Sequence, residues 1–301
     1  MAERIGRLLT AMITPFDSDG NVDYPQARRL ALALVASGSD GIVVAGTTGE
    51  SPSLTREEQT RLFVEIKEAV GDKGDVVAGT GSNSTAEAIK YTEDAQKTGA
   101  DAVLSVVPYY NKPPQEGLYQ HFKAIAESTD LPVILYNVPG RTSTNINTDT
   151  VVRLSQIPNI VGIKEAGGDL NQVAHIIQDA RPGFLVWSGN DDQTYPIMAL
   201  GGYGIISVAS HIVGNQIKAM MGMMLDGDLK QAAAEHRRML PIFQGLFVIA
   251  NPIPVKYAVN KIGFMVGNPR LPLVPPDVTI AAQIDALIKE YQVDLPVPSG
   301  T

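Results

Sequence analysis

Eight short apolar runs, separated by longer segments with helical spacing, constrain the fold of this 301-residue chain more than any other feature. The runs are continuous stretches rich in Val, Ile and Leu, which is typical of buried parallel strands covered by helices. They occupy residues 8–14, 41–46, 76–79, 102–108, 133–138, 160–163, 184–188 and 204–209.

The segments between the runs carry the start and stop signals of helices. Thr55 followed by Glu58 predicts a capping box at the start of one helix. Residues 85–98 form another segment of this kind, which stops at Gly99, a residue that commonly ends helices. The alternation of strand and helix therefore continues through most of the chain.

Eight strand and helix units within roughly the first 220 residues match a (β/α)8 TIM barrel, whereas a doubly wound sheet has about five or six strands. We therefore predict an α/β fold with the barrel over residues 1–225 and a C-terminal helical region over residues 226–301. Helices are expected at 215–224, 229–240 and 280–291, with the proline-containing segments 251–254 and 271–276 as interruptions.

Composition excludes several classes of function. With 24 Lys and Arg against 32 Asp and Glu, the net charge of −8 argues against an electrostatic binder of nucleic acid or membrane surfaces. The chain has no cysteine, which excludes disulfides, zinc thiolate sites and a cysteine nucleophile. The N-terminal residues lack the pattern of a signal peptide and every apolar run is too short to span a bilayer, so we expect a cytoplasmic protein.

Polar residues follow five of the runs, where the active sites of this barrel form. They combine hydroxyls, tyrosines, one arginine and one lysine, without a histidine cluster or a phosphate-binding loop. We interpret the adjacent acids Asp191 and Asp192 as a helix start rather than as metal ligands. The segments are 46–51, 108–111, 136–142, 163–166 and 188–192.

Lys164 is the most informative of these residues, because a lysine at the end of an apolar strand lies in a partly desolvated barrel interior. Desolvation favours the neutral amine, which attacks carbonyl carbons to form a Schiff base. The alternative is a structural lysine that pairs with Glu165 or extends to the rim of the barrel.

Other residues at the same mouth admit a chemical and a structural interpretation. Tyr136 can relay a proton or simply pack at its strand end. Thr47 and Thr48, flanked by glycines, can bind a carboxylate or form a plain turn. Arg141 can bind a second carboxylate through two parallel hydrogen bonds or remain solvated.

Together these motifs resemble the class I pyruvate aldolases related to dihydrodipicolinate synthase. The resemblance covers nearly the whole chain. It is carried by Thr14–Phe16, Gly46–Ser51, Tyr136–Thr142, Gly162–Lys164 and Asn251–Lys256.

The resemblance implies that Lys164 forms a Schiff base with pyruvate, and that the derived enamine condenses with L-aspartate 4-semialdehyde in the biosynthesis of lysine and diaminopimelate. It implies a proton relay of Tyr136, Thr47 and Tyr110, with Tyr110 contributed across a subunit contact. Thr48 would hold the pyruvate carboxylate, and Arg141 the carboxylate of the semialdehyde.

The same resemblance implies that Gly189 and Ile206 line the site through their backbone, and that no metal or other cofactor takes part. The expected partners are small-molecule substrates and further copies of the chain in a homotetramer, with no nucleic acid and no membrane. Ser51, Asn83, Glu87 and Tyr109 match a site where lysine inhibits many relatives.

Four positions depart from the common pattern of the family. Arg56 and Gln59 stand where lysine-sensitive relatives commonly have histidines, which leaves feedback inhibition open. Asn190 and His211 replace the commoner Asp and Asn of their segments.

Two alternative functions remain at this point. One is a sister aldolase acting on another 2-oxo acid, similar to N-acetylneuraminate lyase, although Arg141 suits a short carboxylated aldehyde better than a polyol. The other is a non-catalytic binding protein on the same barrel, which the intact set of Lys164, Tyr136 and Thr47 argues against.

Overall fold

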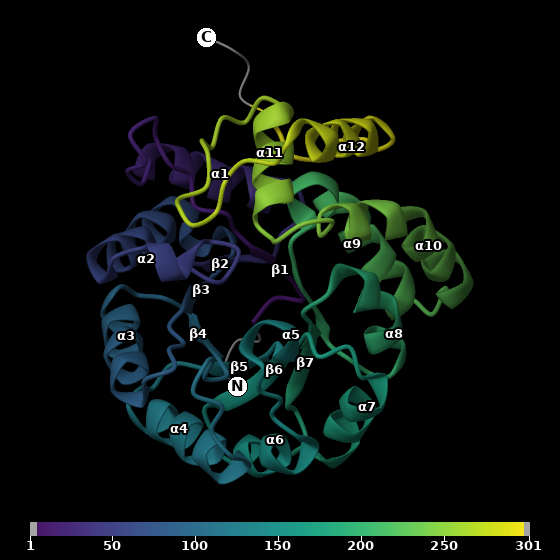
Figure 1. Ribbon diagram of the computed structural model, residues 1–301. Coiled ribbons are helices and arrows are strands. Elements are labelled where there is room, and N and C mark those ends of the chain that lie inside the picture. The colour runs from purple at the N-terminus through teal and green to yellow at the C-terminus, as the bar shows by residue number, and fades with distance from the viewer. Residues whose placement is uncertain (1–4, 298–301) are drawn as a thin grey trace.

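A closed barrel of eight parallel strands forms the centre of the computed structural model, which describes residues 5–297 (Figure 1). Each strand pairs with its successor in the chain, and β8 pairs with β1 to close the ring. The strands are β1 (Leu8–Ala11), β2 (Gly41–Val44), β3 (Asp75–Gly79), β4 (Ala102–Val106), β5 (Val133–Asn137), β6 (Ile160–Glu165), β7 (Leu185–Ser188) and β8 (Gly204–Ser207).

Each of the eight predicted runs coincides with or overlaps one strand, which confirms the barrel. Several runs extend past the end of their strand, as in residues 8–14, where Met12 and Ile13 remain buried after β1 ends at Ala11. The apolar pattern reports burial, whereas the strand ends where the chain leaves the hydrogen-bonded ladder. The buried residues beyond the strands form the mouth of the barrel.

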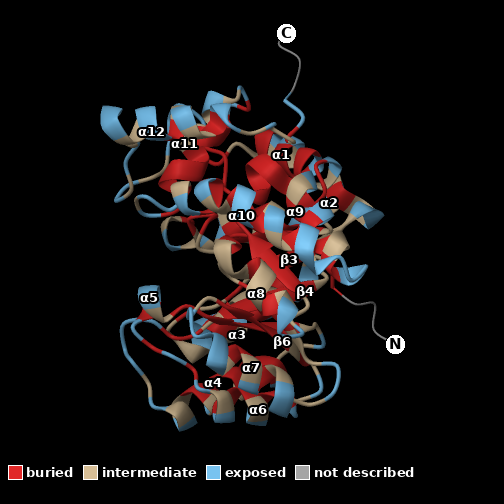
Figure 2. Ribbon diagram, turned by 90° about the vertical axis from the view of Figure 1, so that its right-hand side faces the viewer, coloured by how far each residue is buried: buried red, intermediate tan, exposed pale blue. Residues whose placement is uncertain are grey.

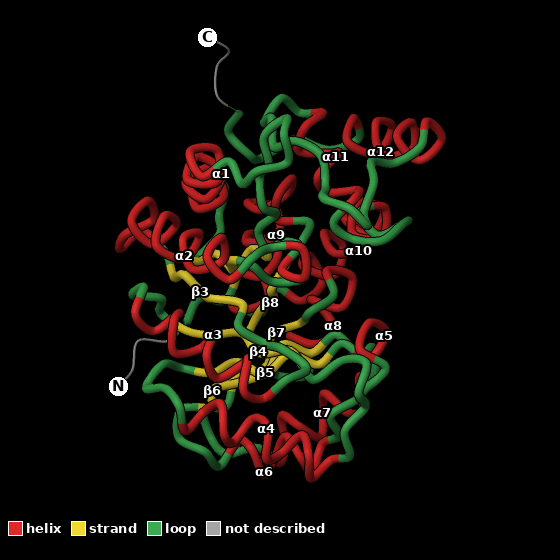
Figure 3. Tube along the Cα trace, turned by 60° about the vertical axis from the view of Figure 1, so that its left-hand side comes forward, coloured by secondary structure: helices red, strands yellow, loops and turns green. Residues whose placement is uncertain are grey.

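Helices surround the barrel as a ring (Figures 1 and 3). The predicted capping box is present, because the Thr55 side chain accepts from the Glu58 amide while the Glu58 side chain accepts from the Thr55 amide. The helices up to β8 are α1 (Tyr24–Ala36), α2 (Arg56–Val70), α3 (Thr85–Lys97), α4 (Gln115–Glu127), α5 (Pro139–Thr142), α6 (Thr148–Ser155), α7 (Leu170–Asp179) and α8 (Thr194–Ala199).

Four helices follow β8, namely α9 (Ser210–Leu225), α10 (Leu229–Gly245), α11 (Ile253–Lys261) and α12 (Val278–Lys289). Residues 251–254 lie at an interruption of the helices as expected, because α10 ends at Gly245, and their last two residues also begin α11. Proline is tolerated in the first turn of a helix, where its missing N–H would have no partner in any case. Likewise α10 continues beyond residue 240 with Pro241 inside it.

Two apolar layers hold the fold together. The larger layer packs the outer faces of the strands against the helices, and the smaller one fills the barrel with residues such as Leu9, Val77, Ile134 and Trp187. Buried residues accordingly form a continuous band through the strands in Figure 2. Within residues 5–297, no helix is both long enough and apolar enough to cross a bilayer.

Candidate active site

Lys164 lies on β6 between two aromatic neighbours in the barrel wall. The strand register pairs it with Tyr136 on β5 and with Trp187 on β7. The next residue, Glu165, accepts hydrogen bonds from Asn137 Nδ2 at 3.0 Å and from the Gly167 amide at 2.6 Å. Among the described residues no ion pair joins Glu165 to Lys164, so the structural pairing considered above does not form.

Burial controls the acidity of the Lys164 amine. Its side chain is 5% exposed, and Nζ lies 4.4 Å from the centre of the Tyr136 ring. Burial lowers the pKa of Lys164 from 10.5 to about 8, with the Arg141 charge acting in the same direction and the Asp191 charge against it. The barrel therefore holds an amine that is partly neutral near physiological pH.

Tyr136 is buried beside this amine. Burial raises the pKa of its phenol, while the Arg141 charge and a hydrogen bond with Thr47 lower it. Because burial dominates, the phenol keeps its proton at neutral pH and can donate or accept one through its hydroxyl. Tyr110, by contrast, is 89% exposed on the surface of the subunit, with a positive φ of 73°.

The loop after β2 carries both threonines and is held from the C-terminal region. Thr48 is buried, and its Oγ1 accepts a hydrogen bond from Asn251 Nδ2 at 2.9 Å. The Asn251 carbonyl oxygen in turn accepts from Arg141 Nη2 at 3.2 Å. The residue just before the first turn of α11 therefore contacts two predicted site residues, a role that was not predicted for it.

A buried ion pair holds the same loop two residues further on. Glu50 Oε1 lies 2.7 Å from Lys256 Nζ, and both side chains are excluded from solvent. Glu50 Oε2 accepts from the Arg270 amide at 2.9 Å. These contacts fix Glu50 in a left-handed conformation with φ of 58°, which is uncommon for a residue other than glycine.

Asp191 is a second functional candidate that the sequence interpretation missed. It does begin a short helical turn, η3 (Asp191–Gln193), as expected, but its carboxylate is buried and accepts from the end of β8 and the loop after it. The donors are Ser207 Oγ at 2.5 Å and the Val208 and Ala209 amides at 3.1 Å. Burial raises the pKa of the Asp191 carboxyl, while its three donors and the Lys164 charge lower it. In its ionised form Asp191 places a negative charge near the Lys164 amine.

In the sequence, Gly189 precedes Asp191 and Ile206 follows it. Gly189 donates from its amide to the Glu165 carbonyl at 2.7 Å, and a Cβ at Gly189 would meet the Ala166 Cβ at 2.6 Å. Only glycine therefore fits there without a shift of the backbone. Ile206 lies on β8 and is fully buried in the barrel core.

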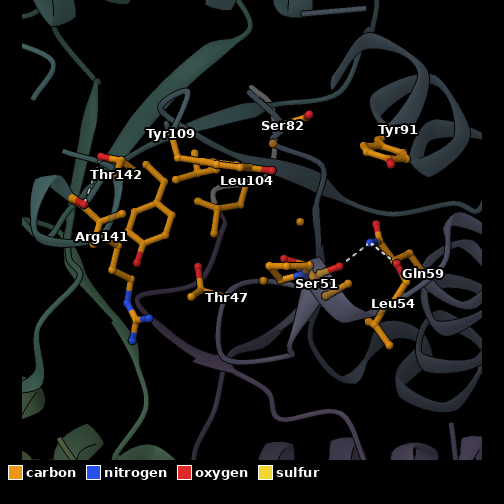
Figure 4. Close-up of a pocket in the computed structure, with 18 of the residues that line it drawn as sticks. Thr47, Ser51, Leu54, Gln59, Ser82, Tyr91, Leu104, Tyr109, Arg141 and Thr142 are labelled. Atoms are coloured by element: carbon orange, nitrogen blue, oxygen red, sulfur yellow. Dashed lines mark hydrogen bonds between the residues drawn. The ribbon is translucent and has the colours of Figure 1, made fainter. Parts of the chain in front are cut away.

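A cavity of about 410 Å³ opens at this end of the barrel (Figure 4). Thr47, Tyr136 and Arg141 line it together with Ser51, Glu87 and Tyr109, so residues predicted for catalysis and for regulation border one continuous space. In Figure 4 Thr47 lies between Arg141 on one side and Ser51 on the other.

The part of the cavity around Ser51 is polar. Gln59 Nε2 donates to the Ser51 carbonyl at 3.0 Å, and Ser82 Oγ donates to Glu87 Oε2 at 2.9 Å. Asn83 lies beside it and accepts from Asn111 Nδ2 through its carbonyl at 2.8 Å.

Arg56 does not share this space. It forms an ion pair with Asp94 and donates to the Lys90 carbonyl at 3.2 Å. Its charge is therefore neutralised on the outer side of α3.

The two remaining departures from the family pattern have local explanations. His211 is fully buried, donates from Nδ1 to the Val208 carbonyl at 2.8 Å and accepts from the Ile13 amide at 3.3 Å. Burial lowers its pKa to about 4, so it is a neutral side chain that joins two loops of the mouth. Asn190 Nδ2 donates to Gln193 Oε1 at 3.1 Å within η3.

Comparison with known proteins decides the family. The model of the dihydrodipicolinate synthetase family matches residues 4–291. The 4-hydroxy-tetrahydrodipicolinate synthase of Dehalococcoides mccartyi (strain CBDB1) is 59% identical over 295 residues, which cover 98% of this chain and 99% of that protein. The chain is a member of the dihydrodipicolinate synthetase family.

Solved structures place the fold in the same family. The dihydrodipicolinate synthase of Bacillus anthracis has a TM-score of 0.93 and 47% identity, covering 95% of this chain and 98% of its own. The synthase of Cyanidioschyzon merolae, solved with lysine bound, has a TM-score of 0.94 with the same identity and coverage. The fold and the family expected from the sequence motifs are both confirmed.

Proposed function

We propose that this member of the dihydrodipicolinate synthetase family is a 4-hydroxy-tetrahydrodipicolinate synthase. It is a lyase of the class I aldolase type that condenses pyruvate with L-aspartate 4-semialdehyde in lysine and diaminopimelate biosynthesis. The observation that carries the proposal is the buried Lys164 amine, with its lowered pKa, beside the Tyr136 ring. The name and near full-length similarity of the Dehalococcoides relative support the choice of substrates.

The reaction begins when the neutral Lys164 amine attacks the keto carbon of pyruvate. Loss of water from the resulting carbinolamine gives a Schiff base, and loss of a methyl proton gives an enamine. The enamine carbon forms a bond with the aldehyde carbon of the semialdehyde, whose oxygen takes up a proton. The amino group of the semialdehyde then attacks the Schiff-base carbon, which closes the ring and releases the Lys164 amine.

Protons in these steps move through the Tyr136 and Thr47 hydroxyls, which line the same cavity, with Thr47 lowering the pKa of the Tyr136 phenol. We propose that Tyr110 of the partner subunit completes this relay in a homotetramer. The exposure of Tyr110, next to the cavity-lining Tyr109, supports a role at a subunit contact. Size-exclusion chromatography with light scattering tests the tetramer, and a monomer that keeps full activity contradicts the shared relay.

The two carboxylates of the substrates have separate binding groups. The Thr48 hydroxyl and amide bind that of pyruvate, and the Arg141 guanidinium binds that of the semialdehyde, since Arg141 lines the cavity. Gly189 and Ile206 shape the site through their backbone, where only glycine fits beside Ala166.

The polar part of the cavity is proposed as a lysine-binding regulatory site formed by Ser51, Asn83, Glu87 and Tyr109. The Glu87 carboxylate offers a partner for an ammonium group, and the pairing of Arg56 with Asp94 removes a competing cation. The relative from Cyanidioschyzon merolae was solved with lysine bound. Inhibition by lysine that is weakened in Glu87→Gln supports the site, whereas full activity in millimolar lysine contradicts it.

Borohydride reduction in the presence of pyruvate, followed by peptide mass spectrometry, tests the central proposal. We expect one reduced pyruvate on the peptide that contains Lys164, and none in Lys164→Ala. Lys289→Ala, which removes an exposed lysine, is the matched control and keeps the label. A folded wild-type protein without an adduct would refute the Schiff-base mechanism.

A further inference from the structure

Asn251 is a buried side chain from the C-terminal region that reaches the mouth of the barrel. It is 6% exposed and precedes the first turn of α11, yet its side chain contacts Thr48, 203 residues earlier in the chain. The motif that contains Asn251 has no part in the mechanism given above.

The direction of this hydrogen bond constrains the Thr48 hydroxyl. An amide nitrogen only donates, so Thr48 Oγ1 is the acceptor in the 2.9 Å contact with Asn251 Nδ2. A hydroxyl has one hydrogen and two lone pairs, and here one lone pair is occupied. The hydrogen of Thr48 is therefore left to donate to another acceptor, such as a carboxylate of a bound substrate.

The amide of Asn251 has no competing partner. Its Oδ1 is buried and lacks a hydrogen-bond partner among residues 5–297. Buried polar atoms in proteins almost always have a hydrogen-bond partner. Because Oδ1 has none, hydrogen bonds to this oxygen do not determine where the Asn251 side chain lies. Its one described side-chain hydrogen bond is to Thr48.

The backbone around Asn251 is anchored independently of its side chain. The Asn251 carbonyl accepts from Arg141, and Lys256, on the helix α11 that follows, forms the buried pair with Glu50. Both contacts persist when the Asn251 side chain is changed. Substitutions at this position therefore probe the amide head alone.

We propose that Asn251 is a positioning residue for pyruvate, whose amide fixes the Thr48 hydroxyl so that the Thr48 hydrogen bonds to the carboxylate of the keto acid. This inference rests on the function proposed above for Lys164 and Thr48. Asn251 itself acts through Thr48.

The test is the pyruvate concentration that gives half-maximal borohydride trapping on Lys164. In Asn251→Ala we expect this concentration to rise about tenfold, the size typical of one lost hydrogen bond near a charged group, with the maximal adduct unchanged. Asn251→Asp has the same shape without a donor and adds a negative charge, so its rise is larger. The KM for the semialdehyde stays unchanged, because the contact between Arg141 and the Asn251 carbonyl remains.

Two further variants separate positioning from general loosening of the region. Asn260→Ala removes two hydrogen bonds of a side chain on α11, from Nδ2 to the Gly267 carbonyl at 2.8 Å and from the Val266 amide to Oδ1 at 2.7 Å. It is expected to leave pyruvate trapping unchanged. In a double-mutant cycle, Asn251→Ala adds nothing to Thr48→Val, since it acts through the hydroxyl that is already removed.

Several results would overturn the positioning role. The first is an unchanged pyruvate concentration for half-maximal trapping in Asn251→Ala or Asn251→Asp. The second is an equal rise of this concentration in Asn260→Ala. The third is additivity of Asn251→Ala and Thr48→Val in the double-mutant cycle. In each of these the wild-type protein still forms the adduct, so the proposed function stands. Failure of the wild-type protein to form any adduct overturns the proposed function, and the positioning role with it.

Discussion

The pH dependence of Schiff-base formation follows from the burial of Lys164. Its pKa is about 8 instead of 10.5, a difference of 10.5 − 8 = 2.5 units. At pH 7 about 9% of such amines are neutral, against about 0.03% of ordinary lysines, which is a gain of roughly 300-fold. Because the neutral amine is the nucleophile, the rate of adduct formation is expected to rise tenfold per unit up to about pH 8 and to level off above it.

Rapid mixing with saturating pyruvate measures this profile directly. Samples between about pH 5.5 and 9.5 are quenched with borohydride at successive times, and intact-mass spectrometry gives the labelled fraction. The carboxyl group of pyruvate is ionised throughout this range. The buried His121 and His211, with their pKa values lowered to about 4, remain neutral in it. Lys256 also titrates in this range, because burial lowers its pKa to about 8 as well. The same profile measured on Lys256→Met therefore assigns the rising limb to the Lys164 amine.

A rate that still rises tenfold per unit at about pH 9.5 would refute the reasoning, because it would mean that the barrel does not desolvate the amine. A rate that is independent of pH between about 6 and 8 would refute it as well. Lys164→Ala supplies the blank at every pH. The exposed-lysine variant Lys289→Ala should reproduce the wild-type midpoint.

Three further predictions concern the supports of the site. Asp191→Asn removes a negative charge near the reactive amine, so the midpoint of adduct formation should move below pH 8. The free energy of unfolding in urea should fall by about 1–3 kcal/mol. An unchanged midpoint would contradict the electrostatic role. Lys256→Met leaves the Glu50 carboxylate buried without its cation, which should lower the free energy of unfolding by about 3–5 kcal/mol in urea. Adding Glu50→Gln should restore part of this stability, and a loss below about 1 kcal/mol would show that the pair is dispensable. Gly162→Ala places a Cβ 2.3 Å from the Leu185 carbonyl oxygen and should lower the free energy of unfolding by about 1–3 kcal/mol. Gly222→Ala on α9 meets open space and should raise it by about 0.5–1 kcal/mol. Equal shifts of the melting temperature in the two variants would contradict this packing argument.

The barrel could be predicted from the sequence because its signals are local. Each strand is a short apolar run, and each helix start such as Thr55 carries its own capping residues. Lys164 was identified for the same reason, since a lysine at the end of such a run is informative without knowledge of its neighbours. The structure adds the direction of Glu165, which excludes the structural pairing.

Asn251 and Asp191 could not be assigned in this way, because their roles depend on contacts made after the chain closes. The prolines beside Asn251 indicated an interruption, and only the tertiary structure brings its amide to Thr48. Asp191 was correctly expected at a helical turn, but its three donors come from β8 and the loop that follows. Sequence patterns report periodicity and burial, and they do not report which distant polar groups meet.

The ion pair between Glu50 and Lys256 also has a consequence for the order of events during synthesis on the ribosome. A nascent chain that ends at residue 250 contains all eight strands and the reactive lysine. It lacks Asn251, Lys256 and Arg270, three residues that hold the loop of Thr48 and Glu50 from the C-terminal side. The mouth of the barrel is therefore completed only after residues 251–270 have emerged, later than all eight strands and Lys164, so catalytic competence follows barrel formation during synthesis.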